Sequence, residues 1–187
     1  MLVNAIEVAQ NWHKGQFRKN QKVQLPYHLH PSDVIMCLVH WGVNDEEVLS
    51  GAALHDVVED TPCQLEDLFD FSYKVRLYVE EMTQEEGISK EDYINKFENC
   101  SIESFVIKLA DRFCNIIDFA CEYKYKKYFK SLERFFTLYY TRRWEIVDRF
   151  GEKTAKRILF DFEHIQRLLK RWYDFDVELK EELVYET

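Results

Sequence analysis

Residues that break regular structure are scarce in this chain, and this scarcity limits the fold more than any other feature. Only five glycines and three prolines interrupt 187 residues, and the stretches between them mix Leu, Ile, Val, Phe, Lys and Glu. Apolar residues recur there at the three- and four-residue spacing of a helix face, not at the two-residue spacing of a strand. The sequence therefore predicts an all-α fold.

We expect a single domain over residues 1–187, because this length suits one core better than two. The motifs described below lie within residues 13–115. Residues 123–187 are rich in aromatic and charged side chains at amphipathic spacing, so they should add supporting C-terminal helices. The predicted helices span residues 2–13, 31–41, 46–58, 65–71, 73–83, 92–99 and 103–122, with two or more beyond residue 123.

Glycine, proline and polar residues define the ends of the first three helices. Gly15 should end the first helix in the left-handed conformation that helix C-termini favour, and Gly42 should stop the second. Asn44 or Asp45 can cap the third helix, which Thr61-Pro62 terminates.

The charge of the chain narrows the classes of partner. Asp and Glu number 34 against 25 Lys and Arg, giving a formal charge of −9 that would repel a nucleic-acid backbone. We therefore expect no nucleic-acid partner. A small phosphorylated metabolite remains compatible, since a bound cation and a local basic cluster can dominate one pocket.

The cysteines and the N-terminus indicate the cellular compartment. Five cysteines without a CxxC pair argue against a disulfide framework and against a structural zinc cluster. There is no basic leader with a cleavage site, and no apolar run approaches the ~20 residues that span a bilayer. We expect a cytoplasmic protein without membrane association, and the sequence leaves its oligomeric state open.

The segment HDVVED at residues 55–60 is the first sign of chemistry. On a helix, His55 and Glu59 are four residues apart, as are Asp56 and Asp60, so their side chains line one end of a face. Imidazole nitrogens and carboxylate oxygens together suit manganese, iron or zinc, with positions left for water and a phosphate oxygen. The alternative is a charged helix end with a hydrogen-bonded histidine.

Two distant residues strengthen the metal interpretation. His30 stands at a predicted helix start, and Asp111 lies inside the apolar stretch VIKLADRFCNII, where an uncompensated carboxylate is costly to bury. Metal ligation would remove that cost. Lys108 and Asn115 can face the same pocket from one helix, although hydrogen bonds within the bundle are the alternative for both.

Five motifs in a fixed order carry a family resemblance. They are HxGQxRK, PYxxHP, AALHDVVEDT, MT and IKLADRxxN, at residues 13–19, 26–31, 52–61, 82–83 and 107–115. In this order they resemble the hydrolase domain of the RelA/SpoT alarmone enzymes. The stand-alone small alarmone hydrolases, the metazoan SpoT homologue among them, look especially similar. The resemblance spans about the first two thirds of the chain.

The resemblance implies an all-helical HD fold that binds one Mn²⁺ ion. The implied ligands are His30, His55, Asp56 and Asp111. The implied reaction removes pyrophosphate from the 3′ position of guanosine tetra- and pentaphosphate, and Glu59 and Asp60 would support attack by water. This agrees with general chemistry, since a metal lowers the pKa of bound water and a carboxylate can orient that water or accept its proton.

The same resemblance implies the substrate contacts. Arg18 and Lys19 should border the nucleotide base or its 5′ phosphates, Asn115 should meet the ribose, and Lys108 should add a further contact. A solvated basic loop is the alternative for Arg18 and Lys19.

Other histidines and aromatic residues should have structural or solvent-exposed roles. The histidines outside the implied ligand positions are His13, His28, His40 and His164. An aromatic stripe is expected in the core or at a subunit interface, not in base stacking. Its members are Tyr125, Tyr128, Phe129, Phe135, Phe136, Tyr139 and Tyr140.

Departures from the family pattern leave the substrate open. The loop before Pro26 lacks the usual glycine and carries Leu25, and Ile117 stands where the family often has an arginine. The alternatives are a phosphohydrolase of an adenine alarmone, NADPH or a nucleoside phosphate, and a nucleotide-binding HD module without turnover. Intact Glu59 and Asp60 argue against the binding module.

Overall fold

The computed structural model describes residues 1–18, 24–118 and 125–185, and only the backbone of residues 118, 125–130 and 172–185. Its helices are α1 (Leu2–Trp12), α2 (Leu29–Trp41), α3 (Glu46–Leu54), α4 (Val57–Asp60), the 3₁₀ helix η1 (Leu65–Leu68), α5 (Tyr73–Met82), α6 (Lys90–Lys96), α7 (Ile102–Asp118), α8 (Tyr125–Phe150) and α9 (Glu152–Tyr185). The described residues contain no β-strand, only an isolated bridge between Phe17 and Pro26. The predicted all-α class is confirmed.

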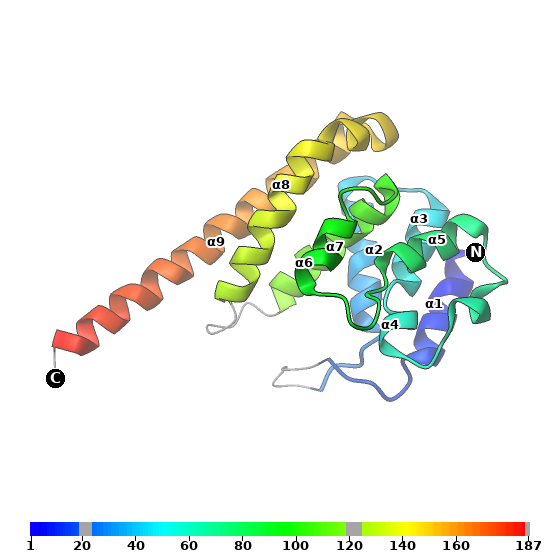
Figure 1. Cartoon of the computed structure of the whole chain (residues 1–187), viewed down its shortest axis with the longest axis horizontal. Helices are drawn as coiled ribbons and strands as arrows, with labels where there is room; N and C mark the ends of the chain where they lie inside the picture. Colours follow the sequence, from blue (N-terminus) through cyan, green and yellow to red (C-terminus); the bar gives the residue numbers. More distant parts are fainter. Residues whose placement is uncertain (19–23, 119–124, 186–187) are drawn as a thin grey trace.

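Two parts of the fold are visible in Figure 1. Helices α1 to α7 gather into one cluster, which holds the N-terminus. Helices α8 and α9 form a long antiparallel hairpin that packs on α7 and α2, and the C-terminus lies at its far end (Figure 1). Contacts between α2 and α7 run through the middle of the cluster, with α3 packed against α2 and α5 against α3.

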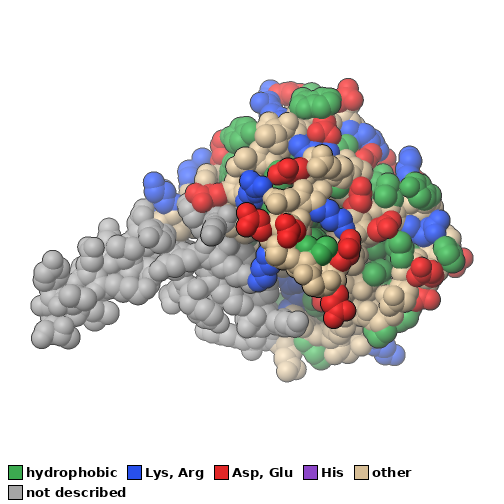
Figure 2. Space-filling model, viewed as in Figure 1, with side chains coloured by type: hydrophobic (Ala, Val, Ile, Leu, Met, Phe, Trp, Pro, Cys, Tyr) green, Lys and Arg blue, Asp and Glu red, His purple; other side chains and the backbone are tan. Residues whose placement is uncertain are grey.

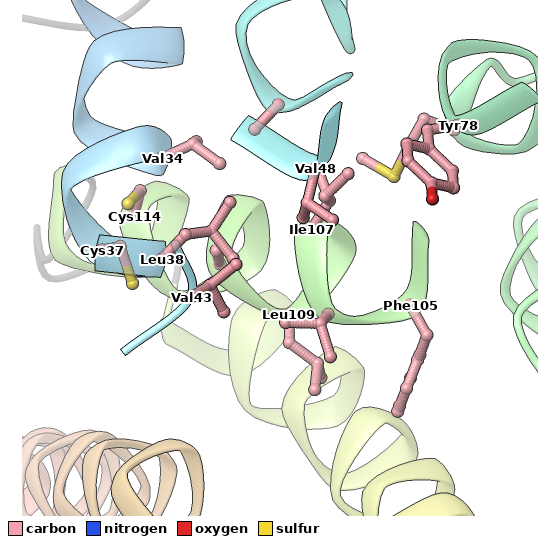
Figure 3. Close-up of a cluster of buried hydrophobic side chains, with 14 of the residues drawn as sticks. Val34, Cys37, Leu38, Val43, Val48, Tyr78, Phe105, Ile107, Leu109 and Cys114 are labelled. Carbon is pink, nitrogen blue, oxygen red and sulfur yellow. The ribbon is translucent and has the colours of Figure 1, made fainter. Parts of the chain in front are cut away.

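The core lies where α2, α3, α5 and α7 meet. Figure 3 shows apolar side chains from these helices facing one another, among them Val34, Leu38, Val48, Tyr78 and Ile107. All five are almost fully buried. Removing this apolar surface from water is the main favourable term in folding such a bundle, and it fixes the positions of the helices that surround the candidate site.

Two of the three predicted helix-capping residues lie where the sequence predicts them. Asp45 caps α3, because its carboxylate accepts hydrogen bonds from the backbone N–H groups of Glu47 and Val48 at 2.9 and 3.3 Å. Gly42 ends α2 in the left-handed conformation, with φ +99°. Gly15 also has a positive φ, but it follows the end of α1 instead of forming its cap.

Two helix boundaries differ from the prediction in ways that matter for the site. Helix α2 begins at Leu29, so His30 lies in its first turn and not before it; turn hydrogen bonds from Leu29 and His30 back to Pro26 and Tyr27 start the helix early. The prediction of one continuous helix over residues 46–58 is wrong, because α3 ends at Leu54 and α4 starts at Val57.

Smaller differences affect the later helices. The segment predicted over 65–71 is a short 3₁₀ helix, and α6 begins at Lys90, because Ser89 caps it by accepting a bond from the Asp92 N–H. Helix α7 covers the predicted helix up to Asp118, and residues 119–122 lie outside the described residues.

The hairpin is tied to the cluster by a few specific bonds. The buried guanidinium of Arg142 donates to the carbonyl oxygens of Phe97 and Cys100, each at 2.9 Å. The indole N–H of Trp41 donates to the Asp161 carboxylate at 2.8 Å. These bonds fix α8 against the loop before α7, and α9 against α2.

The described members of the aromatic stripe lie mainly in the core. Phe135, Phe136 and Tyr139 are buried as expected, whereas Tyr140 is exposed. The side chains of Tyr125, Tyr128 and Phe129 lie outside the described residues.

Charges of both signs are interspersed over the face of the molecule in Figure 2, which shows no long stripe of one sign among its described side chains. No described helix is both long and apolar enough to cross a membrane.

Close packing at Gly51 generates a stability prediction. A Cβ atom there would lie 3.0 Å from the Tyr78 Cβ and 3.4 Å from the Ile107 Cδ1. We expect Gly51→Val to lower the free energy of unfolding by about 1–3 kcal/mol, because the added methyl groups overpack the contact of α3 with α5 and α7. Urea unfolding measures this change. The control Gln10→Val, on the exposed face of α1, should cost less than about 0.7 kcal/mol, and equal losses would contradict the packing explanation.

Candidate metal centre

Side chains from three separate segments converge at one end of the cluster. His30 comes from the first turn of α2, His55 and Asp56 from the turn between α3 and α4, and Asp111 from the middle of α7. Ligand atoms of His30, His55 and Asp56 all lie within 4.8 Å of one another. The Asp111 Oδ1 lies 3.1 Å from the Nε2 of His30 and 3.8 Å from that of His55. The four predicted ligands therefore come together.

The break between α3 and α4 makes this convergence possible. Neighbouring residues of a straight helix lie about 100° apart around its axis, so a change of chain direction after His55 helps both side chains to reach one ion. His55 and Asp56 form a turn between the two helices, and Asp56, with φ −100° and ψ −4°, departs from ideal helix angles while it stays in the right-handed region. As a result, the Asp56 Oδ2 lies 3.0 Å from the His55 Nε2.

His55 has the tautomer and orientation of a metal ligand. Its Nδ1 lies 2.8 Å from the carbonyl oxygen of Ala52, so Nδ1 carries the proton and donates it there. Its Nε2 is buried and has no hydrogen-bond partner, although it points at two carboxylates. A buried imidazole nitrogen that faces carboxylates fits a cation, which would replace the proton that Nε2 carries without it.

Ionic interactions dominate the protonation states of the cluster. Burial would raise the pKa of Asp111, but Lys108, whose Nζ lies 2.9 Å from Oδ2, and His30 outweigh burial and hold that pKa well below its usual range. His55 likewise holds the pKa of Asp56 down against burial. Burial opposes the charged form of His55, yet Asp56 and Asp111 raise its pKa to about 9.

Helix α7 supplies a short chain of polar contacts. The Asn115 amide donates to Oδ1 of Asp111, and Arg18 in turn donates to the Asn115 Oδ1 at 3.0 Å. The Lys108 ammonium also lies over the rings of Tyr93 and Phe97, 5.0 and 5.7 Å from their centroids. Lys108 and Asn115 therefore both contact Asp111, as their spacing on one helix predicts.

Glu59 and Asp60 lie at the edge of the cluster on α4. The Glu59 Oε2 accepts a hydrogen bond from the Gln84 N–H at 3.1 Å, and partial desolvation raises its pKa. Asp60 does not touch the cluster directly but is joined to it through Tyr27, whose hydroxyl lies 2.6 Å from the Asp56 Oδ2 and 2.7 Å from the Asp60 Oδ2.

Sequence reasoning missed Tyr27 and its neighbours as site residues. Burial and the adjacent Asp56 charge raise the pKa of Tyr27, so it remains a hydroxyl donor. His13 stacks on Tyr27, and Gln16 donates to the Asp60 carbonyl oxygen at 2.8 Å. All three stand inside the quoted motifs. The spacing of a motif does not reveal which residues act on another side chain, so the sequence predicts no site role for Tyr27 and Gln16 and only a structural or solvent-exposed role for His13.

The remaining predicted residues are Lys19 and the histidines outside the proposed ligand set. Lys19 lies outside the described residues. Within the part of the chain that the structure describes, His30, His55 and Asp56 form the one group with metal-ligating geometry, and none of the other four histidines belongs to it. Two imidazoles and two carboxylates form a mixed donor set that fits a divalent transition metal.

This chain is similar to known proteins in both sequence and structure. No family model matches the chain. It is 35% identical over 124 residues to the guanosine-3′,5′-bis(diphosphate) 3′-pyrophosphohydrolase MESH1 of Xenopus tropicalis, an alignment that covers 63% of this chain and 69% of that protein. The human protein of the same name is 34% identical over 123 residues, which cover 63% and 68%.

Two further proteins are similar to this chain, one in sequence and one in structure. A GTP pyrophosphokinase of Streptomyces coelicolor is 35% identical over 130 residues, 62% of this chain and 14% of that much longer protein. A solved structure of a metazoan ortholog of SpoT, described as hydrolysing ppGpp, superposes with a TM-score of 0.69 at 24% identity. It covers 87% of this chain and 94% of its own, so the two chains share a fold.

The His55 environment generates a pH prediction for chelator-treated protein. The folded state keeps the His55 proton up to a pKa of about 9, whereas the unfolded chain loses it near 6.5. Protonated His55 therefore stabilises the folded state fully below pH 6.5, and this stabilisation is lost as the pH rises to about 9. Urea unfolding across this range should show the fall. His55→Asn should remove it, while His40→Asn, at an exposed histidine, should retain it; a fall of equal size in His55→Asn would refute the assignment.

Proposed function

Because this chain belongs to the guanosine-3′,5′-bis(diphosphate) 3′-pyrophosphohydrolase family, we propose that it removes the 3′-pyrophosphate of guanosine tetra- and pentaphosphate. The products are GDP or GTP and pyrophosphate. The relatives confirm the family that the five sequence motifs indicated, and with it the HD type of the all-α fold.

The observation that carries the proposal is the buried cluster on α2, the α3–α4 turn and α7. We assign four side chains as ligands of one divalent ion, with Mn²⁺ expected: His30, His55, Asp56 and Asp111. The unpartnered Nε2 of His55 supports this assignment. The chemistry that such an ion supplies is Lewis-acid polarisation of a phosphate oxygen and of the attacking water.

We assign water activation to Glu59 and Asp60. Glu59 stands at the edge of the cluster with a raised pKa, which makes it a better proton acceptor near neutral pH than an ordinary carboxylate. The carboxylate of Asp60 is held by the Tyr27 hydroxyl and its backbone carbonyl by Gln16, so its position is fixed. Both groups can orient water beside the phosphate.

We assign substrate binding to Arg18, Lys19, Asn115 and Lys108. Arg18 and Asn115 are hydrogen-bonded to each other beside Asp111, a position from which they can meet the ribose and the base or its 5′ phosphates. Lys108 is mostly buried and paired with Asp111, so its role includes keeping that carboxylate ionised; its substrate contact stays a prediction.

We further propose that the whole chain acts as one domain, with α8 and α9 as support, and that it works in the cytoplasm on the alarmone of the stringent response. Ile117, on the exposed surface after Asn115, offers no charge where the family often has an arginine. This difference in charge bears on which nucleotide base the site accepts.

The direct test is turnover. Mn²⁺-loaded protein should convert guanosine tetraphosphate to GDP and pyrophosphate, which anion-exchange chromatography separates. An adenine alarmone and NADPH serve as competing substrates in parallel reactions. Faster release of pyrophosphate from the adenine alarmone, or of orthophosphate from NADPH, would move the assignment to that substrate. Tight nucleotide binding without any turnover would instead support a binding module.

Single changes should separate metal binding from catalysis. His55→Ala and Asp111→Asn should lose bound Mn²⁺ and turnover together, because each removes a proposed ligand. Glu59→Gln should retain the metal and lower kcat by about 10²-fold or more, since it removes only the proton acceptor. Metal content by plasma mass spectrometry and steady-state kinetics measure both effects. Full metal content with full turnover in His55→Ala would overturn the site assignment.

A further inference from the structure

One tyrosine hydroxyl joins two carboxylates that the proposed mechanism treats separately. The Tyr27 oxygen lies 2.6 Å from the Asp56 Oδ2 and 2.7 Å from the Asp60 Oδ2. Asp56 is a proposed metal ligand, and Asp60 is proposed to orient water. The Tyr27 hydroxyl therefore connects the proposed ligand Asp56 to the carboxylate of Asp60.

The geometry points to Tyr27 as a positioning residue for the hydrolysis, one that fixes the Asp60 carboxylate relative to the ligand Asp56. This inference rests on the proposed function, which it deepens by adding a residue to the same site. Tyr27 acts through the two carboxylates, and no direct contact with the substrate is assigned to it.

The ring of Tyr27 is held in place without help from its hydroxyl. It packs on His13 with ring centroids 4.6 Å apart, and the Arg18 guanidinium lies 5.7 Å from its centroid. Its backbone N–H donates to the Gln16 carbonyl oxygen at 2.9 Å. Because these contacts survive in Tyr27→Phe, that variant should fold and should remove the hydroxyl bonds alone.

Asp60 needs such a support because it lies in the last turn of a four-residue helix. Helix α4 buries Val57 and leaves Asp60 exposed, so packing does little to fix the Asp60 side chain. Gln16 holds the Asp60 backbone carbonyl, and Tyr27 holds its carboxylate. A misplacement of about 1 Å can cost about 10²-fold in rate, which sets the scale of the expected effect.

The hydroxyl has one proton for two acceptors. It donates to one carboxylate at a time, and an ionised carboxylate offers no proton in return. By alternating between Asp56 and Asp60, the proton keeps both carboxylates beside one oxygen atom. Removal of this oxygen leaves Asp60 without a carboxylate partner there, while Asp56 keeps its contact with His55. A purely structural tyrosine would show no coupling to either carboxylate.

The first measurement is Mn²⁺ binding by isothermal titration, which does not depend on the substrate. Tyr27→Phe should raise the Mn²⁺ dissociation constant about tenfold, as the loss of a bond to a ligating carboxylate commonly does. The matched control is Tyr139→Phe, which removes another hydroxyl bond, to Ala155 O at 2.7 Å, in the α8–α9 hairpin. The control should bind Mn²⁺ as the wild type does.

The second measurement is kcat at saturating Mn²⁺ in a double-mutant cycle. Tyr27→Phe should lower kcat about tenfold to a hundredfold with KM little changed, because the substrate contacts remain. In an Asp60→Asn background the same change should lower kcat far less, since the group that Tyr27 orients has already been altered.

The outcomes distinguish this inference from the proposed function. Equal losses of kcat in both backgrounds, or no loss in either, would overturn the positioning role. If the wild type turns over no guanosine tetraphosphate, the proposed substrate is wrong, and the Mn²⁺ titration alone tests the role of Tyr27. A weaker Mn²⁺ affinity in Tyr27→Phe would then support that role, and an unchanged affinity would overturn it. The titration also decides if Asp60→Asn is too slow to measure.

Discussion

The carboxylate of Asp111 is buried in the middle of α7, and the groups around it balance its negative charge. An isolated buried carboxylate would cost several kcal/mol or take up a proton. Here Lys108 balances its charge from within the same helix, while His30 contacts it from α2. The packing of α2 on α7 is therefore electrostatic as well as apolar, and the proposed ion would occupy a position that the fold already prepares for positive charge.

Much of this could be predicted from sequence because it depended on spacing and residue type. Helix periodicity and a few breakers indicated the all-α class, and the resemblance of five ordered motifs indicated the ligand set. The turn at His55–Asp56 was missed, because no glycine or proline marks it. The helix is interrupted there without a local breaker, so tertiary contacts outweigh local preference at this turn.

Tyr27 illustrates a second limit of sequence reasoning. Its side chain acts on Asp56 and Asp60, which lie 29 and 33 residues away along the chain. A ligand reveals itself by residue type and burial, but a residue that orients another side chain can be recognised only once the two are seen in contact. Motif residues without an assigned role are therefore good places to look for such supports.

The division between the cluster and the hairpin has a consequence for how this sequence can change over evolutionary time. No described residue of the candidate site comes from α8 or α9, and the hairpin is tied to the cluster by a few bonds, such as those of Arg142 and Trp41. Exposed positions of the hairpin, such as Tyr140, can thus accept new surface residues without altering the site. The two residues of the α3–α4 turn have no such freedom, because a single added or lost residue there would rotate His55 away from Asp56.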